Sequence, residues 1–229
     1  MHHEHRDVTG GWLRPTVFGA MDGLVSNFAL ITGVAAGSHS DPTAVVLAGI
    51  AGLGAGAFSM AAGEYVSVAS QAELALAEIE IERRELERNP DAEREELARL
   101  YRARGLDPGL ASEVARQLSR NPASALGVHV REELGLSVDD LPSPVLAAGS
   151  SLLSFAAGAF LPLAPYLLGA SSLRPAVIVA VISLFTAGAV VSRITARSWW
   201  ASGLRQLALG GVAAALTFGL GSLAGSAGI

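Results

Sequence analysis

The chain contains no cysteine and no lysine, and aromatic and charged residues are scarce. The absence of cysteine excludes a disulfide framework, a thiolate metal site and a cysteine nucleophile. All sixteen basic residues are arginine, and the net charge of −5 argues against a nucleic-acid-binding protein, which would need a basic face. The remainder is strongly apolar, since 51% of the 229 residues are hydrophobic and only 16% are charged. This composition is unlike that of an ordinary soluble domain.

Long apolar runs dominate both ends of the chain. A helix that crosses a hydrocarbon core roughly 30 Å thick needs about 20 residues, and five runs reach or approach this length. They cover residues 15–36, 43–63, 141–173, 175–192 and 206–229. The sequence therefore predicts an all-α membrane protein with five spanning helices. The polar start of the chain is not typical of a signal peptide, and we interpret His2, His3 and His5 as a terminal segment rather than a site.

Arginine is distributed unequally between the segments that connect these runs. If the N-terminus is cytoplasmic, fifteen of the sixteen arginines lie on the cytoplasmic side, and Arg174 is the exception. Positively charged loops stay preferentially on that side of a membrane. We therefore expect the N-terminus in the cytoplasm and the C-terminus outside.

The first run carries one charge, Asp22. An ionisable group inside a span is costly, and it usually faces a water-filled path or a partner. We interpret Asp22 as part of a transport path. The alternative is that Asp22 caps a broken helix or pairs with Arg14, although eight positions separate these two residues, a poor fit for direct pairing.

A polar segment separates the second run from the third. Three dipeptides in it each place a residue suited to an N-cap before a proline at the first helical position. They are Asn89-Pro90, Asp107-Pro108 and Asn121-Pro122. We therefore expect the second spanning helix to continue to about Arg88, followed by three shorter helices that form an inserted cytoplasmic domain. The chain then divides into residues 1–72, 73–140 and 141–229.

Acidic residues of this insert recur at helical spacing, so that neighbours three or four positions apart share a helix face. The acids are Glu78, Glu82 and Glu85, then Glu93 and Glu96, and finally Glu133, which pairs with the imidazole of His129. Carboxylates gathered with one imidazole suit Fe²⁺, Mn²⁺ or Zn²⁺. The alternative is a solvated helical hairpin with surface Glu–Arg pairs, which spacing alone favours.

Three stretches of the chain carry longer ordered motifs. They are FGAMDGLVSNFALITGVAAG from Phe18, AGAFSMAAGEYVSVASQAE from Ala55, and GVHVREELGL from Gly127. The first resembles the DGLV-x-x-FAL-x-x-G signature of the vacuolar iron transporter family, and the second resembles the family's A-x-SM-x-x-GEY-x-S stretch. The third is similar to the segment that closes the family's metal-binding domain. Bacterial and plant members of this family export divalent iron and manganese in exchange for protons.

The resemblance implies a homodimer with five spans per subunit and an ion path between the two copies of the first span. It assigns pore positions to Asp22 and Met60. It also implies that a cytoplasmic three-helix domain collects metal through Glu82, Glu85, Glu93, Glu96 and Glu133. The cargo would be Fe²⁺ or Mn²⁺, with Zn²⁺ and Co²⁺ as alternatives, and no prosthetic group is expected. The remaining partners would be protons and the lipid bilayer of a bacterial inner (plasma) membrane.

Several positions depart from the plant members of the family. Gly11, Pro15 and Gly52 stand where those members have carboxylates, so the pore is predicted to contain fewer acids. His129 and Val130 stand where the metal-binding domain of the family has paired methionines. The imidazole of His129 remains a metal donor but a harder one than a thioether.

Two questions stay open at the level of the sequence. Glu64, one turn after Met60, is either a relay acid between the insert and the pore or an interfacial charge. A different function would be a membrane-anchored di-iron carboxylate enzyme of ferroxidase type. Such bundles favour Glu-x-x-His motifs, which the insert lacks, and that reading leaves Asp22 and Met60 without a role. We therefore predict a transporter and not an enzyme.

Overall fold

The computed structural model describes residues 11–138, 140–195 and 197–227, and all regular secondary structure among them is α-helical. His2, His3 and His5 lie outside the described residues. The chain forms two compact units. The membrane unit contains the residues up to Val66 and those from Pro144 onward, and the polar unit is Ser67–Ser143. The range of the polar unit includes residues 73–140, for which the sequence predicts an insert.

Five helices are long and apolar enough to cross a bilayer, which confirms the five expected spans. They are α1 (Leu13–Gly37), α2 (Pro42–Arg88), α6 (Pro144–Leu167), α7 (Leu173–Thr195) and α8 (Trp199–Ser226). Helix α8 begins at Trp199 rather than at residue 206, because hydropathy marks the part of a helix that fits the bilayer and not the point at which helical hydrogen bonding begins.

Helix α2 is much longer than a membrane requires. Its 47 residues correspond to about 70 Å at 1.5 Å per residue, whereas a span needs about 20 residues. The uncharged part of α2 ends at Gly63, and its acid-rich part runs from Glu73 to Arg88. The acids of this second part therefore lie outside the membrane-spanning portion of the helix.

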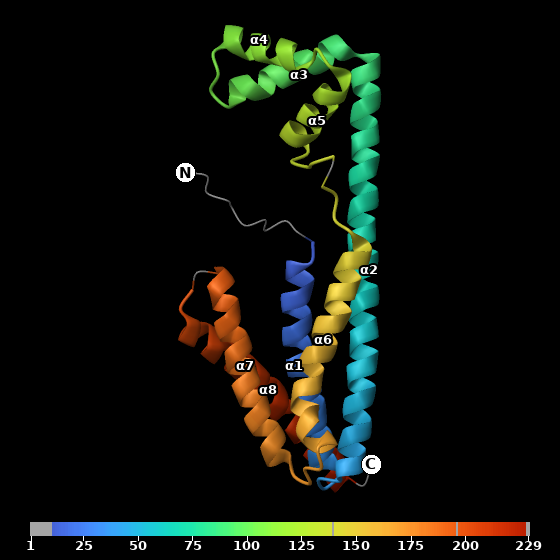
Figure 1. The fold of residues 1–229 in the computed structure, drawn as a ribbon, viewed down its shortest axis with the longest axis vertical. Helices are drawn as coiled ribbons and strands as arrows, with labels where there is room; N and C mark the ends of the chain where they lie inside the picture. The colour runs from blue at the N-terminus through green and yellow to red at the C-terminus, as the bar shows by residue number, and fades with distance from the viewer. Residues whose placement is uncertain (1–10, 139, 196, 228–229) are drawn as a thin grey trace. The chain divides into compact units, whose positions relative to one another are not determined.

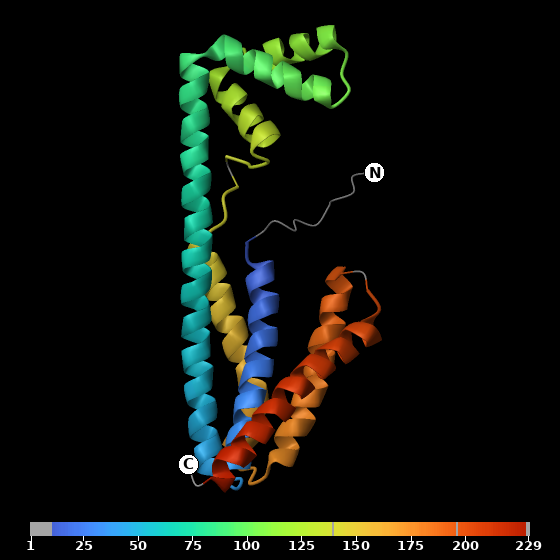
Figure 2. The ribbon, with the colours of Figure 1, turned by 180° about the vertical axis from the view of Figure 1, so that it is seen from behind.

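Helix α1 is central to the membrane unit. Figures 1 and 2 show it between α6 on one side and the pair α7 and α8 on the other. Leu24 and Phe28 of α1 pack against Leu184 of α7 and Ala214 of α8. Ile31 packs with residues of α2 and α6, including Leu163. The helix that carries Asp22 is thereby held by packing along most of its length.

Glycine allows α1 and α6 to approach each other closely. A Cβ atom at Gly23 would lie 2.2 Å from the carbonyl oxygen of Phe155, and one at Gly158 would lie 2.1 Å from that of Ala20. Such distances exclude any side chain, so the two backbones are in direct contact. Small residues at helix crossings are typical of membrane proteins. Helix α1 is also continuous through Asp22, and the described residues form no ion pair between Asp22 and Arg14.

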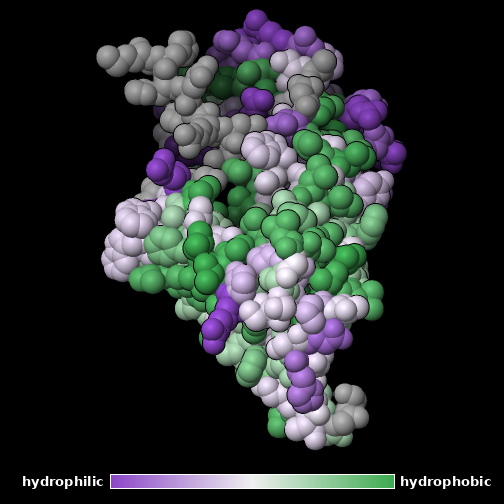
Figure 3. All heavy atoms as spheres, turned by 60° about the horizontal axis from the view of Figure 1, so that its bottom comes forward, coloured by the Kyte–Doolittle hydropathy of each residue, from purple (hydrophilic) through white to green (hydrophobic). Residues whose placement is uncertain are grey.

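Much of the membrane unit's outer surface is apolar. Figure 3 shows hydrophobic residues gathered in broad areas of the face in view. Large side chains with more than half of their area exposed include Leu47, Phe58, Leu153, Leu216 and Leu220. A soluble monomer rarely exposes so much contiguous apolar surface, whereas a lipid-facing surface requires it.

The polar unit contains three short helices after α2. They are α3 (Pro90–Ala103), α4 (Pro108–Leu118) and α5 (Pro122–Glu133), as the three Asx-Pro dipeptides predicted. Figure 1 shows α3 and α4 side by side, and α5 contacts both. Leu97, Ala98 and Ala115 form the small core. Asp107 caps α4 by accepting a hydrogen bond from the Gly109 N–H at 2.9 Å.

One expected cap is not formed. Asn89 precedes Pro90 at the start of α3, but its side chain makes no capping hydrogen bond. The backbone carbonyl of Asn89 nevertheless accepts from the N–H groups of Ala92 and Glu93. Helix α3 therefore starts where the sequence predicts, through the proline and the backbone rather than through the amide side chain.

Candidate functional site

Four residues of the polar unit bring metal-type ligand atoms together. Glu82 lies on α2, Glu93 on α3, and His129 and Glu133 on α5. One ligand atom from each residue lies within 4.8 Å of all the others. Glu82 is 6% exposed, Glu93 is 7% exposed and His129 is fully buried. We call this group the carboxylate cluster.

The distances within the carboxylate cluster match those between ligands of one cation. The Nδ1 atom of His129 lies 2.9 Å from Oε1 of Glu133, 3.0 Å from Oε1 of Glu82 and 3.9 Å from Oε2 of Glu93. Adjacent ligands around an octahedral cation bonded at roughly 2.1 Å are about 3.0 Å apart. A ring nitrogen carries at most one proton, so Nδ1 cannot donate to three carboxylates. A cation would satisfy all of them at once.

Hydrogen bonding leaves part of the carboxylate cluster unsatisfied. Oε1 of Glu82 and Nε2 of His129 are buried and have no hydrogen-bond partner among the described residues. Buried polar atoms are nearly always partnered in folded proteins, so exceptions at a cluster of carboxylates point to a missing ion or ligand. The donor set of three carboxylates and one imidazole fits a borderline divalent metal.

Burial and mutual repulsion raise the carboxyl pKa values of this group. The pKa of Glu82 rises to about 7, first because of burial and next because of the charge of Glu133, while His129 acts in the opposite direction. Burial also raises the pKa of Glu93 and of Glu133, and the charges of Glu85 and Glu96 add to both shifts. The carboxylate cluster is therefore electrostatically unfavourable when ionised and empty, and a bound cation would relieve it.

The other acids predicted from spacing lie outside the carboxylate cluster. Glu85 and Glu96 are exposed, and they act on the carboxylate cluster through their charge rather than as members of it. Glu96 lies 4.0 Å from Arg99. Glu78 is exposed and contributes no atom to the group.

A signal in the sequence could have distinguished the inward acids from the outward ones. Glu82 continues the helix face of Ala75 and Ile79, which are both buried. Glu93 precedes the buried Leu97 by one turn, and His129 follows the buried Ala125 by one turn. Acids on the apolar stripe of a helix point into the unit, and acids off that stripe face water.

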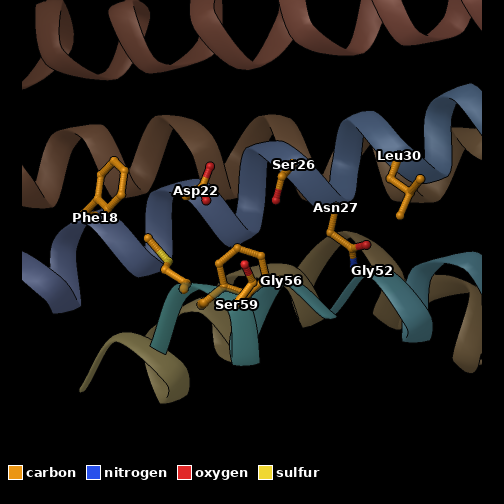
Figure 4. Close-up of a pocket in the computed structure, with 10 residues that line it drawn as sticks. Phe18, Asp22, Ser26, Asn27, Leu30, Gly52, Gly56 and Ser59 are labelled. Atoms are coloured by element: carbon orange, nitrogen blue, oxygen red, sulfur yellow. The ribbon is translucent and has the colours of Figure 1, made fainter. Parts of the chain in front are cut away.

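A second candidate site lies in the membrane unit between α1 and α2. It is an open pocket of about 360 Å³ whose lining includes Asp22, Asn27, Ser59 and Met60. Figure 4 shows Asp22 and Ser26 on α1, with Gly56 and Ser59 on the neighbouring α2. The two pore residues expected from the sequence, Asp22 and Met60, thus line one pocket.

Other polar residues of this pocket were not predicted. Ser26 follows Asp22 by one turn and was detectable from that spacing, whereas Asn27 was not. Glu64 is half-buried on α2 and is not among the residues that line the pocket. The pocket combines one carboxylate with neutral oxygen donors and a thioether, which suits a partly dehydrated cation.

Comparison with known proteins addresses the identity of the whole chain. The profile of the VIT family matches residues 13–222, a range that includes both candidate sites. The chain belongs to the VIT family. Its relatives include the vacuolar iron transporter of Acanthamoeba castellanii, which is 40% identical over 96% of this chain and 82% of the relative. Vacuolar iron transporter 2 of Oryza sativa subsp. japonica is 31% identical over 96% and 90% of the two chains.

Membership of the VIT family agrees with the resemblance noted in the sequence. Vacuolar iron transporter 1 of Arabidopsis thaliana is also similar, with 30% identity over 95% of this chain and 88% of the relative. The names of these relatives describe transporters and not enzymes. The di-iron enzyme alternative is therefore not favoured, and this VIT-family protein is an integral membrane protein of the transporter class.

Proposed function

We propose that this VIT-family protein exports divalent iron, and manganese as a second cargo, from the cytoplasm. The observation that carries the proposal is the buried carboxylate cluster, in which three carboxylates surround one imidazole nitrogen. The names of its relatives, which are iron transporters, support iron as the cargo. The five helices that are long and apolar enough to cross a membrane are consistent with a transporter.

Capture would take place in the polar unit. Glu82, Glu93, His129 and Glu133 would replace water around the metal, because their ligand atoms already lie at coordination spacing. The exposed Glu78, Glu85 and Glu96 would raise the local concentration of cations through their negative charge. Zn²⁺ and Co²⁺ fit the same donor set and are tested as alternative cargo.

Passage would take place along the pocket that Asp22 and Met60 line. The Asp22 carboxylate would offset the hydration that the cation loses, and the Met60 thioether would favour Fe²⁺ over harder ions. In a homodimer, two copies of α1 would supply two carboxylates to one path. Glu64 would serve as a relay acid near the cytoplasmic end of the spanning part of α2.

Proton antiport would couple this movement to a pH gradient. Carboxylate ligands must be deprotonated to bind metal, so protonation on the far side of the membrane would release it. The arginine distribution supports the required orientation, with the N-terminus and the polar unit in the cytoplasm and the C-terminus outside. Localisation to a bacterial inner membrane fits this direction of export.

Flux into proteoliposomes tests the proposed function. Purified protein is reconstituted, and uptake of Fe²⁺, Mn²⁺, Zn²⁺ and Co²⁺ is followed with and without a pH gradient. We expect Fe²⁺ and Mn²⁺ uptake that increases when the vesicle lumen is acidic. Absorbance of ferric iron is recorded in parallel, because catalytic turnover to Fe³⁺ without uptake would support the enzyme alternative. Uptake no greater than that of empty vesicles would refute the transport proposal.

A further inference from the structure

Asn27 is a buried polar residue in the membrane unit with one fixed interaction. It lies on α1, five residues after Asp22, and is only 2% exposed. Its Nδ2 atom donates a hydrogen bond of 2.7 Å to the carbonyl oxygen of Ala159 on α6. A carbonyl oxygen can only accept, so this contact fixes the amide with its nitrogen toward α6.

The amide oxygen of Asn27 is left without a partner. Oδ1 is buried and accepts no hydrogen bond from any described residue. Buried amide oxygens are costly to leave unsatisfied, and a bound ion or water is one of the explanations for such an exception. Asn27 lines the same pocket as Asp22 and Met60, and in Figure 4 its side chain points from α1 toward α2.

Gly52 on α2 approaches this oxygen closely, because it carries no side chain. A Cβ atom at position 52 would lie 3.0 Å from Oδ1 of Asn27 and 2.3 Å from Cδ2 of Leu30. The second of these contacts involves the far end of a flexible side chain, which can move. The first would place a methyl group directly against the unpartnered oxygen.

We infer that Oδ1 of Asn27 is a neutral oxygen ligand for the divalent cation that passes Asp22. This inference rests on the proposed transport function and adds a residue to its path. One turn and a half of helix separates Asn27 from Asp22, or about 7.5 Å along the axis. An amide oxygen is a hard donor without charge. It replaces one water of the cation, and because it neither titrates nor adds charge, it does not hold the cation as a carboxylate would.

Gly52→Ala tests this inference without altering Asn27. The new methyl group blocks Oδ1 but leaves the hydrogen bond from Asn27 to Ala159 in place. Gly54→Ala on the same helix is the matched control, since a Cβ atom there meets nothing within 4 Å. We expect Gly52→Ala to lower Fe²⁺ and Mn²⁺ flux by roughly tenfold, the size of effect seen when a group that supports a bound metal is lost. Gly54→Ala should transport at the wild-type rate.

The ratio of the two fluxes distinguishes a ligand from a structural role. Mn²⁺ is the harder ion and depends more on oxygen donors, while Met60 remains available to Fe²⁺. We expect Gly52→Ala to lower Mn²⁺ flux more than Fe²⁺ flux, with an unchanged melting temperature and unchanged metal binding by the carboxylate cluster. An equal loss of both fluxes together with a lower melting temperature would mean that the change only disturbs helix packing, and it would overturn the inference.

Two substitutions of Asn27 itself provide an independent test if Gly52→Ala does not fold. Both Asn27→Asp, with its carboxylate ionised, and Asn27→Leu lose the N–H group that donates to Ala159. Only Asn27→Asp keeps a side-chain oxygen toward the pocket. A ligand role predicts measurable flux in Asn27→Asp and none in Asn27→Leu. A purely structural role predicts that Asn27→Asp is at least as impaired as Asn27→Leu, because it also buries a charge against a carbonyl oxygen.

The failure of this inference is distinguishable from failure of the transport proposal. If wild-type vesicles carry no metal, the transport proposal and the inference about Asn27 are both refuted. If wild-type vesicles carry metal, Asp22→Asn vesicles do not, and Gly52→Ala matches Gly54→Ala, the transport proposal stands and the inference is wrong. In that case Oδ1 of Asn27 binds at most a water molecule outside the path.

Discussion

The carboxylate cluster of the polar unit and the pocket between α1 and α2 are built from different donors. The cluster contains three carboxylates and an imidazole, mostly buried and within 4.8 Å of one another. The pocket contains one carboxylate, the exposed Asp22, together with serine hydroxyls, an amide and a thioether. A site with several charged ligands binds a cation tightly, whereas a path must bind weakly enough to release it. This difference supports our proposal that capture takes place in the first region and passage in the second.

The largest expected effect comes from removing Asp22, the one charged residue among the described residues that line the pocket. Asp22→Asn keeps the size of the side chain and one oxygen, but it removes the charge that offsets the lost hydration of the cation. We expect Fe²⁺ flux into proteoliposomes to fall by at least roughly 100-fold, the equivalent of ~3 kcal/mol. Calorimetry on the same variant should show unchanged metal binding by the polar unit. Flux at the wild-type rate would make Asp22 a structural residue and remove the pocket from the path.

Removing a carboxylate from the carboxylate cluster should weaken metal binding by the polar unit. Glu82→Gln and Glu93→Gln each remove one inward carboxylate, and we expect either to reduce the metal affinity of the full-length protein in detergent by about 10–100-fold. Glu85→Gln and Glu96→Gln are the matched controls, because both acids are exposed and act only through charge. If the four variants weaken binding equally, the acids form a diffuse charged surface and the carboxylate cluster is not a defined site.

A smaller effect is expected at the thioether of the pocket. Met60→Leu conserves volume, so the fold should change by less than about 1.5 kcal/mol. Loss of the soft donor should lower Fe²⁺ flux by roughly two- to fivefold and Mn²⁺ flux by less. Parallel uptake assays of the two ions measure this difference. A uniform loss for both ions would indicate that Met60 contributes packing alone.

The smallest effect concerns stability and pH. The carboxyl group of Glu82 has an ordinary pKa of 4.5 that rises to about 7 in the folded protein. Between these values the folded state binds more protons than the unfolded state, so the stability of the metal-free protein should decrease as the pH rises from about 4.5 to about 7. We expect the melting temperature, measured by circular dichroism in detergent, to fall by several degrees over this window.

Metal addition and a Glu82 variant test the pH prediction further. Divalent metal should restore the lost stability at the upper end of the window, because the cation offsets the repulsion between Glu82 and its neighbours. Glu82→Gln should flatten the pH dependence, since it removes the carboxyl group whose pKa rises to about 7. A melting temperature of the metal-free protein that rises across the window would contradict the assigned burial and repulsion.

The helices were predictable from the sequence because each has a local signal. Apolar runs of span length located five helices, and the prolines at positions 90, 108 and 122 located the starts of three more. The side-chain cap predicted at Asn89 was wrong, because the proline and the backbone suffice to start α3. The earlier start of α8 at Trp199 was also missed, because hydropathy says nothing about helical residues beyond the bilayer.

The candidate sites were predictable only in part. Spacing and resemblance identified the acids, but the separation of Glu82 and Glu93 from the exposed Glu85 and Glu96 depends on how three helices pack around a small core. The position of Asn27 depends on a carbonyl group 132 residues away. Contacts of this kind have no local signature, and they determine which polar atoms are left without a partner.

Metal export in exchange for protons is tested by following metal and protons in the same vesicles. Reconstituted protein is given external Fe²⁺, while one fluorophore in the lumen reports the metal and a second reports the pH. We expect Fe²⁺ entry and alkalinisation of the lumen to occur together, and both to be lost in Asp22→Asn. Fe²⁺ entry without a proton signal would contradict antiport, and no entry beyond that of empty vesicles would contradict the assignment of this chain as a metal exporter.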